Sequence, residues 1–297
     1  MGHNPLWHAH RVVFYAIGIA IFAIATLFFE RGASVEAARS ASCDIPDPFQ
    51  VTITATESKS QQESGENDCR IIAAIARPTI SNRRLVYEDI DGTRKVFGGE
   101  ITLPAAGPSC TITVEPILDP ERGLGGRVRS ESTCDGFIIA TRLAPGNDPP
   151  AQSFSQQSNL ASLSGGSTTI QGELEAKDVI SVVMVEQRMN MGWWYDWGTV
   201  FGGWKQKLAP NYDAFWFWYG PTILSGPTIL SNPTRYHSTY YDRHKSNGFP
   251  VPSLPDTYFE GTITLDGYSN GSGLCSFSWG WTNQYAGTHE DYFCWYI

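Results

Sequence analysis

Large aromatic side chains are concentrated in the last third of this 297-residue chain, and this distribution constrains the fold more than any other feature. Nine of the ten tryptophans lie between Trp193 and Trp295. Each indole brings a large apolar area and one polar N–H, so a cluster of them forms either a heavy core or a binding face. The segment Cys275 to Thr282, CSFSWGWT, alternates large and small side chains without interruption. Because consecutive side chains of a strand point to opposite faces, it predicts a β-strand with one face covered by rings.

Residues 43–144 predict a small antiparallel β-sandwich. Short β-prone segments recur here, with turn clusters about every ten residues, a spacing typical of sandwiches. The dipeptide Asp91-Gly92 predicts a hairpin between Leu85 to Ile90 and Thr93 to Phe97, because both residues tolerate the backbone of tight turns. The segment has few aromatic residues, and we interpret it as a stalk or spacer.

A stretch rich in Pro, Gly, Ser and Gln follows at residues 145–169 and predicts a linker, because this composition buries too little apolar surface to order itself. We therefore expect an all-β fold preceded by an N-terminal hydrophobic helix within 1–42. The β part consists of the sandwich-like domain at 43–144 and, after the linker, a second, aromatic-rich, disulfide-stapled β domain at 170–297. In the last part, Val179 to Val185 is β-branched and favours a central strand, with a helix starting near Glu173 as the alternative.

Two copies of GPTILS, at 220–225 and 226–231, are followed by Asn-Pro-Thr. Proline has no backbone N–H and a fixed φ, so its regular recurrence excludes a helix and disfavours an internal strand. The repeat predicts an extended loop on the surface.

The N-terminal run Val12 to Phe29 is apolar and uncharged, and Arg11 precedes it. Its length is that of a short membrane-spanning helix and exceeds the apolar core of an ordinary signal peptide, which favours an uncleaved anchor. Cleavage ahead of Ala38, after the small residues Val35 and Ala37, is the alternative. Because positive charge is retained in the cytoplasm, the residues from Cys43 onward are expected to be extracytoplasmic in either case.

The cysteines show no CxxC pair, which argues against common zinc and thioredoxin-like motifs and favours disulfides in an oxidising compartment. Pairing of nearest neighbours is the expected connectivity, that is Cys43 with Cys69, Cys110 with Cys134, and Cys275 with Cys294.

The formal net charge of -9 argues against a nucleic-acid partner, which would require a basic surface. No phosphate-binding loop, dinucleotide fingerprint or GxSxG elbow is present, so the sequence identifies neither a cofactor nor a catalytic residue. His237, Asp242 and His244 are candidate metal ligands by residue type. Their spacing does not match a helical zinc motif, and ordinary surface histidines with a paired Asp242 are the favoured interpretation.

Binding through exposed rings is the function that the composition favours. Flat rings beside short polar residues suit sugars, whose apolar faces stack while their hydroxyls form hydrogen bonds. The opposing expectation is that at least half of the rings fill a β core. We therefore predict an extracytoplasmic module that holds a glycan or an envelope protein; an accessory subunit of an envelope complex and a secreted hydrolase with an unrecognised site are the alternatives. The candidate ligand-binding residues are Trp193, Trp194, Tyr195, Asp196, Trp197, Trp216 and Trp218.

Overall fold

The structure, a computed structural model, describes residues 46–66, 70–117, 127–144, 165–196, 198–212, 215–220, 222–231, 234–246 and 255–297. This part of the chain forms nineteen β-strands within a single compact unit, Ser42–Ile297. It contains no helix with the length and hydrophobicity needed to cross a membrane. The predictions for the run 12–29, for Cys43 and Cys69, and for most of the linker fall outside the described residues.

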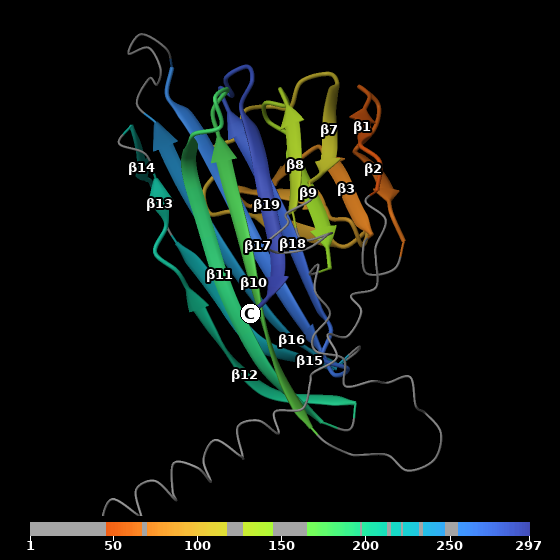
Figure 1. The fold of residues 1–297 in the computed structure, drawn as a ribbon. Coiled ribbons are helices and arrows are strands. Elements are labelled where there is room, and N and C mark those ends of the chain that lie inside the picture. The colour runs from red at the N-terminus through yellow and green to blue at the C-terminus, as the bar shows by residue number, and fades with distance from the viewer. Residues whose placement is uncertain are drawn as a thin grey trace, which may run out of the picture. The chain divides into compact units, whose positions relative to one another are not determined.

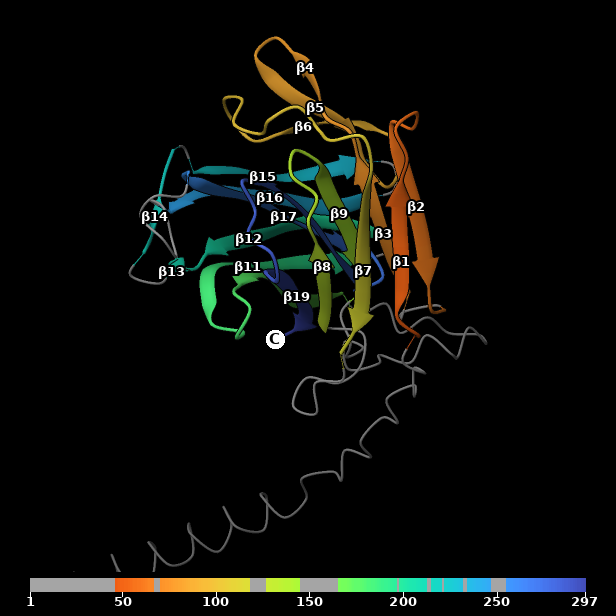
Figure 2. The ribbon, with the colours of Figure 1, turned by 90° about the horizontal axis from the view of Figure 1, so that it is seen from above.

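Two large antiparallel sheets pack against each other (Figure 1), and a third, small sheet lies on the outer side of one of them (Figure 2). Sheet A has the order β1 (Phe49–Ile53), β7 (Cys110–Pro116), β8 (Arg127–Ser132), β19 (His289–Tyr296), β10 (Gly166–Lys177), β11 (Val183–Asp196) and β12 (Thr199–Lys207), and β13 (Asn211–Tyr212) also pairs with β11. Sheet B has the order β14 (Trp216–Trp218), β16 (Thr234–Ser246), β17 (Thr257–Tyr268), β18 (Gly273–Thr282), β9 (Ile138–Leu143), β3 (Ile71–Ala76) and β2 (Lys59–Ser64), and β15 (Ile223–Ser231) also pairs with β16. Sheet C comprises β4 (Thr79–Ser81), β5 (Arg84–Glu88) and β6 (Arg94–Phe97).

The two segments expected to be separate domains share both large sheets. In sheet B, β18 pairs with β9, so that Cys275 lies opposite Leu143. In sheet A, β19 pairs with β8, so that His289 lies opposite Glu131. Each segment thereby supplies a partner for strand edges that the other would leave with unpaired N–H and C=O groups. The described strands of 43–144 and 170–297 therefore build one sandwich, which differs from the expected pair of independent domains.

The core between sheets A and B is unusually aromatic. The inward face of β18 carries Cys275, Phe277, Trp279 and Trp281, all fully buried, which confirms the strand predicted from the alternation in this segment. Trp281 packs edge-on against Trp216, with ring centroids 6.0 Å apart. From Trp193 onward, half of the described aromatic side chains are buried, as large apolar side chains often are.

Both disulfides among the described residues have the predicted pairing. Cys110, at the start of β7, is bonded to Cys134, which follows the neighbouring strand β8. Cys275 on β18 is bonded to Cys294 on β19, and both are fully buried. Because β18 belongs to sheet B and β19 to sheet A, this second bond joins the two sheets across the core. Disulfides are compatible with an oxidising, extracytoplasmic location.

The hairpin predicted at Asp91-Gly92 is confirmed, since β5 and β6 pair on either side of it and Gly92 has a φ of 78°. The GPTILS repeat is exposed and extended as expected, but it forms an edge strand, β15, and not a loop. Its register shifts between Ser225 and Thr228, and this irregularity accommodates Pro227, which has no N–H to donate.

The predicted strand Val179 to Val185 is only partly present, because β11 begins at Val183. Asp178 ends the preceding strand by accepting hydrogen bonds from the backbone N–H groups of Ile180 and Val182 at 3.0 and 2.8 Å. The side chains of Val179 to Val182 are exposed at the resulting turn.

Candidate functional site

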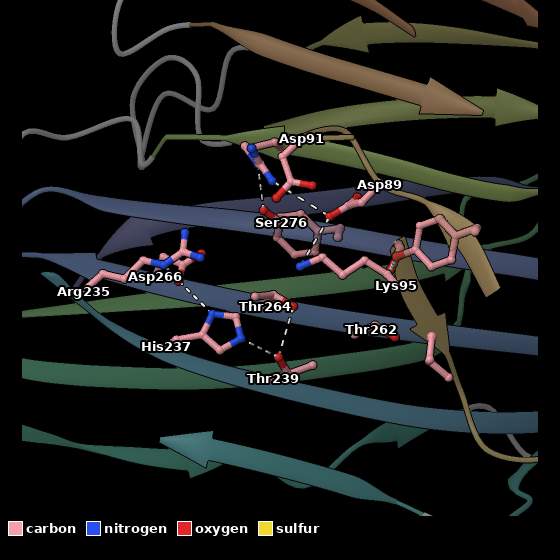
Figure 3. Close-up of a pocket in the computed structure, with 15 residues that line it drawn as sticks. Asp89, Asp91, Lys95, Arg235, His237, Thr239, Thr262, Thr264, Asp266 and Ser276 are labelled. Carbon is pink, nitrogen blue, oxygen red and sulfur yellow. Dashed lines mark hydrogen bonds and ion pairs between the residues drawn. The ribbon is translucent and has the colours of Figure 1, made fainter. Parts of the chain in front are cut away.

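A polar cleft of about 200 Å³ lies on the outer face of sheet B, beneath the β5–β6 hairpin of sheet C (Figure 3). Its floor comes from β9, β16, β17 and β18, and its roof comes from β5, β6 and the turn between them. The polar side chains that line it are Tyr87, Asp89, Asp91, Lys95, Arg142, Arg235, His237, Thr239, Thr262, Thr264, Asp266, Ser276 and Ser278.

Cross-strand register places small hydroxyl side chains side by side on the floor. Thr239 lies opposite Thr264, Thr264 lies opposite Ser276, and Ser276 lies opposite Arg142, so one row crosses four strands. Directly opposed residues of an antiparallel pair are close enough for their side chains to interact. The Oγ1 atoms of Thr239 and Thr264 are 3.4 Å apart, and Arg142 Nε donates to Ser276 Oγ at 3.2 Å. The floor is therefore a continuous strip of hydroxyl donors and acceptors.

The roof is fixed by apolar packing at its base. Leu85 and Phe97 of sheet C pack with Ala76 and Ile138 on the outer face of sheet B. Tyr87 extends from the same hairpin, and its hydroxyl donates to Ser278 Oγ at 3.3 Å. Burial, followed by the nearby carboxylate of Asp89, raises the pKa of Tyr87 well above its ordinary value. The phenol therefore stays protonated and can act as a donor at neutral pH.

Charged groups flank the hydroxyl strip on two sides (Figure 3). On one side, Asp266 Oδ1 lies 2.8 Å from His237 Nδ1 and 3.5 Å from Arg235 Nε. On the other side, Asp89 Oδ2 lies 3.9 Å from Lys95 Nζ and 4.0 Å from an Nη of Arg142. The ion pairs with Lys95, Arg142 and Arg235 are longer than good hydrogen bonds, so these groups retain capacity to bind a ligand.

The charges that line the cleft balance. Its three carboxylates, Asp89, Asp91 and Asp266, are matched by three permanent cations, Lys95, Arg142 and Arg235, and His237 adds nothing when it is neutral. Such a site does not select an anion by net charge, in contrast to the basic surfaces that bind phosphates.

One arrangement in the cleft resembles part of a hydrolytic site. His237 lies between the Asp266 carboxylate and the hydroxyl of Thr239, which is 3.4 Å from its Nε2 atom. Acyl transfer also requires donors for the developing oxyanion. Thr239 is paired on both sides, with Ser225 and with Thr264, and its backbone belongs to the sheet ladder. The arrangement therefore fits hydrogen bonding to a ligand better than acyl transfer.

The predicted aromatic site is divided between the core and two separate surfaces. Trp193 and Trp216 are buried, with exposed fractions of 1 % and 2 %, whereas Trp194 and Trp218 are exposed at 44 % and 48 %. Alternation along β11 turns Trp193 inward and Trp194 outward, so consecutive rings of this motif do not share one face. Trp194 belongs to sheet A and Trp218 to sheet B.

The remaining members of that motif do not restore a common surface. Tyr195 and Asp196 are partly buried at the end of β11, and Trp197 lies outside the described residues. The described candidate residues of β11, Trp193 to Asp196, therefore do not share one exposed face.

The three candidate metal ligands are also not brought together. All lie on β16, but His237 points outward into the cleft, whereas Asp242 and His244 are on the buried, inward face. Asp242 accepts hydrogen bonds from Tyr240 at 2.7 Å and Thr222 at 3.2 Å. Burial lowers the pKa of His244 to about 4. Among the described residues, no group of three side chains has a metal-binding arrangement.

Sequence reasoning singled out only His237 of the residues that line the cleft. Thr262, Thr264 and Asp266 alternate with apolar residues on β17, and Ser276 and Ser278 alternate on β18, but such polar alternation is common to most exposed sheet faces. The feature that distinguishes this face is the hairpin above it, and the packing that places the hairpin there is non-local.

Comparisons of the chain with protein families, with curated proteins and with solved structures find no match.

Proposed function

We propose that this chain is an extracytoplasmic binding module that holds a neutral glycan at the cell envelope, and that the cleft between sheets B and C is its binding site. The observation that carries the proposal is the strip of hydroxyl groups at the floor of a partly enclosed, charge-balanced cleft. Sugar hydroxyls both donate and accept, and the hydroxyl, imidazole, carboxylate and guanidinium groups here supply partners of both kinds. The volume of about 200 Å³ suits a single sugar residue or the end of a chain.

The location is part of the proposal. The two disulfides favour an oxidising compartment, and the apolar run at 12–29 would hold the module at the membrane with its β-sandwich outside. We expect alkaline phosphatase fused after Ile297 to be active in a bacterial host, and a green fluorescent protein at the same position to stay dark, because each reporter matures on one side of the membrane. A fluorescent, phosphatase-inactive result would contradict the location.

Substitutions in the cleft are expected to weaken sugar binding. The full-length chain, kept in a detergent without a sugar headgroup, is screened on a printed array of neutral and acidic sugars, and the best neutral binder is titrated by calorimetry. Thr264→Val keeps the shape of the side chain but removes one hydroxyl, and we expect about a fivefold loss of affinity. His237→Ala removes a larger polar group and is expected to cost about tenfold.

A matched control separates the cleft from the rest of the molecule. Thr113→Val makes the same change on β7 of sheet A, where Thr113 contacts Gln50 at 3.3 Å, and it should leave the affinity unchanged. The proposal fails if no sugar binds, if acidic sugars bind in preference to neutral ones, or if Thr264→Val has no more effect than Thr113→Val.

A further inference from the structure

The outer face of sheet A carries two exposed tryptophans, each packed over a glycine of the neighbouring strand. Trp194 on β11 lies opposite Gly202 on β12, and Trp204 on β12 lies opposite Gly192 on β11. Their exposed fractions are 44 % and 40 %. A Cβ atom at Gly202 would meet the Trp194 ring at 3.4 Å, and one at Gly192 would overlap the Trp204 ring. Each ring therefore occupies the space above the glycine opposite it.

The strand register fixes the positions of Trp194 and Trp204 relative to each other. The two tryptophans are diagonal neighbours across an antiparallel pair, and such positions are about 7–8 Å apart. Because each ring covers a glycine, its outer side is left open to solvent. We refer to Trp194, Trp204, Gly192 and Gly202 as the indole platform.

Uncharged polar side chains border the indole platform on the same face. Ser167 and Thr169 of β10 lie opposite Trp194 and Gly192, and Asn190 of β11 lies opposite Gln171 and Gln206. These side chains supply hydrogen-bond donors and acceptors beside the rings.

We propose that the indole platform is a second glycan site, one that binds the interior of a linear, neutral polysaccharide. Two neighbouring exposed indoles can stack on the apolar faces of sugars, while the adjoining amides and hydroxyls bind their hydroxyl groups. The cleft is roofed and small, and it takes a chain end or a single sugar. None of the described residues forms a roof over the platform, so a chain can lie across it without presenting an end.

The two sites face in opposite directions, because one is on the outer face of sheet A and the other on the outer face of sheet B. A single glycan chain therefore does not occupy both. With a second site, the protein could connect two glycan chains, which extends the proposed function. The evidence for the second site does not depend on the cleft.

The test uses the full-length chain in a detergent without a sugar headgroup, with insoluble cellulose and chitin as the probes. We expect at least one of them to retain the protein, and Trp194→Ala and Trp204→Ala each to reduce its affinity about threefold to tenfold. Trp218→Ala removes a similarly exposed tryptophan from sheet B and should leave retention unchanged. The cleft variant Thr264→Val should likewise leave it unchanged.

Each outcome discriminates between the two sites. Loss of retention in Trp194→Ala together with normal retention in Thr264→Val supports the platform, even if no small sugar binds the cleft. The second site is overturned if neither polysaccharide retains the protein, if Trp218→Ala reduces retention as much as Trp194→Ala, or if Thr264→Val abolishes retention, since the cleft alone would then explain it. Capture of a fluorescent small sugar by protein already bound to polysaccharide would support the joining of two glycans.

Discussion

Replacing both members of the Cys275–Cys294 disulfide with alanine is expected to lower the free energy of unfolding by at least about 3 kcal/mol, the loop-closure contribution for a closed loop of this size. The bond closes a segment with a sequence separation of 19 and joins β18 of sheet B to β19 of sheet A. Both cysteines are fully buried, so the vacated sulfur volume adds a cavity cost to the loss of the cross-link.

The second disulfide provides the matched comparison for this prediction. Cys110 and Cys134 have a similar sequence separation, 24, but they connect neighbouring parts of sheet A and do not span the core. Denaturant unfolding of the two double-alanine variants should show the larger loss for Cys275 and Cys294. An equal or smaller loss at that pair would mean that its position between the sheets adds nothing to stability.

Asp291→Asn is expected to lower the free energy of unfolding by about 3 kcal/mol at neutral pH, as removal of one member of a buried ion-pair network does. The Asp291 side chain has no exposed surface and lies on the outer face of sheet A. Its carboxylate contacts Arg129 Nε at 2.9 Å, Arg127 at 3.0 Å and Lys177 Nζ at 2.8 Å. The asparagine variant would leave these three cations without their shared partner.

The same network predicts how stability depends on pH. Burial alone would raise the pKa of Asp291, but hydrogen bonds from Arg129, Lys177 and Arg127 outweigh it and hold the pKa well below its ordinary value. A carboxyl with a depressed folded-state pKa stabilises the fold above its unfolded pKa, and this stabilisation is lost as the pH falls through the folded pKa. The difference between wild type and Asp291→Asn should therefore shrink as the pH falls below about 4.

Asp256→Asn is the control for the Asp291 prediction. Its carboxylate also forms a short ion pair, 2.7 Å from Lys245 Nζ, but the side chain is 42 % exposed. Exposed pairs contribute roughly 0–1 kcal/mol, so this variant should unfold almost like the wild type. The assigned role of burial would be contradicted if both variants lost the same free energy of unfolding. It would also be contradicted if the difference between wild type and Asp291→Asn did not change with pH.

Local patterns predicted individual strands well and their partners poorly. The alternation of Cys275 to Thr282 identified a strand with a ring-covered face, and Asp91-Gly92 identified the β5–β6 hairpin, because side-chain alternation and turn backbone are properties of neighbouring residues. The pairing of β18 with β9 joins residues more than a hundred positions apart, and no local signal encodes it.

The site was harder to predict than the fold for the same reason. Trp193 and Trp194 are adjacent in sequence, yet Trp193 fills the core and Trp194 faces solvent. Which of the two is buried depends on which face of β11 is turned toward the core. The cleft depends on the register of β16, β17 and β18 and on the hairpin folding back over them. The threonines and serines on its floor are ordinary residues that become a candidate site through this non-local arrangement.

The central claim is that the cleft between sheets B and C binds a neutral sugar, and the most direct test is an experimental structure of the full-length chain with the best neutral sugar from the array bound at saturation. We expect a sugar ring in the cleft, with its hydroxyls within hydrogen-bonding distance of Thr239, Thr264 and Ser276. An empty cleft at a saturating sugar concentration, with the sugar ordered elsewhere on the molecule, would contradict the claim.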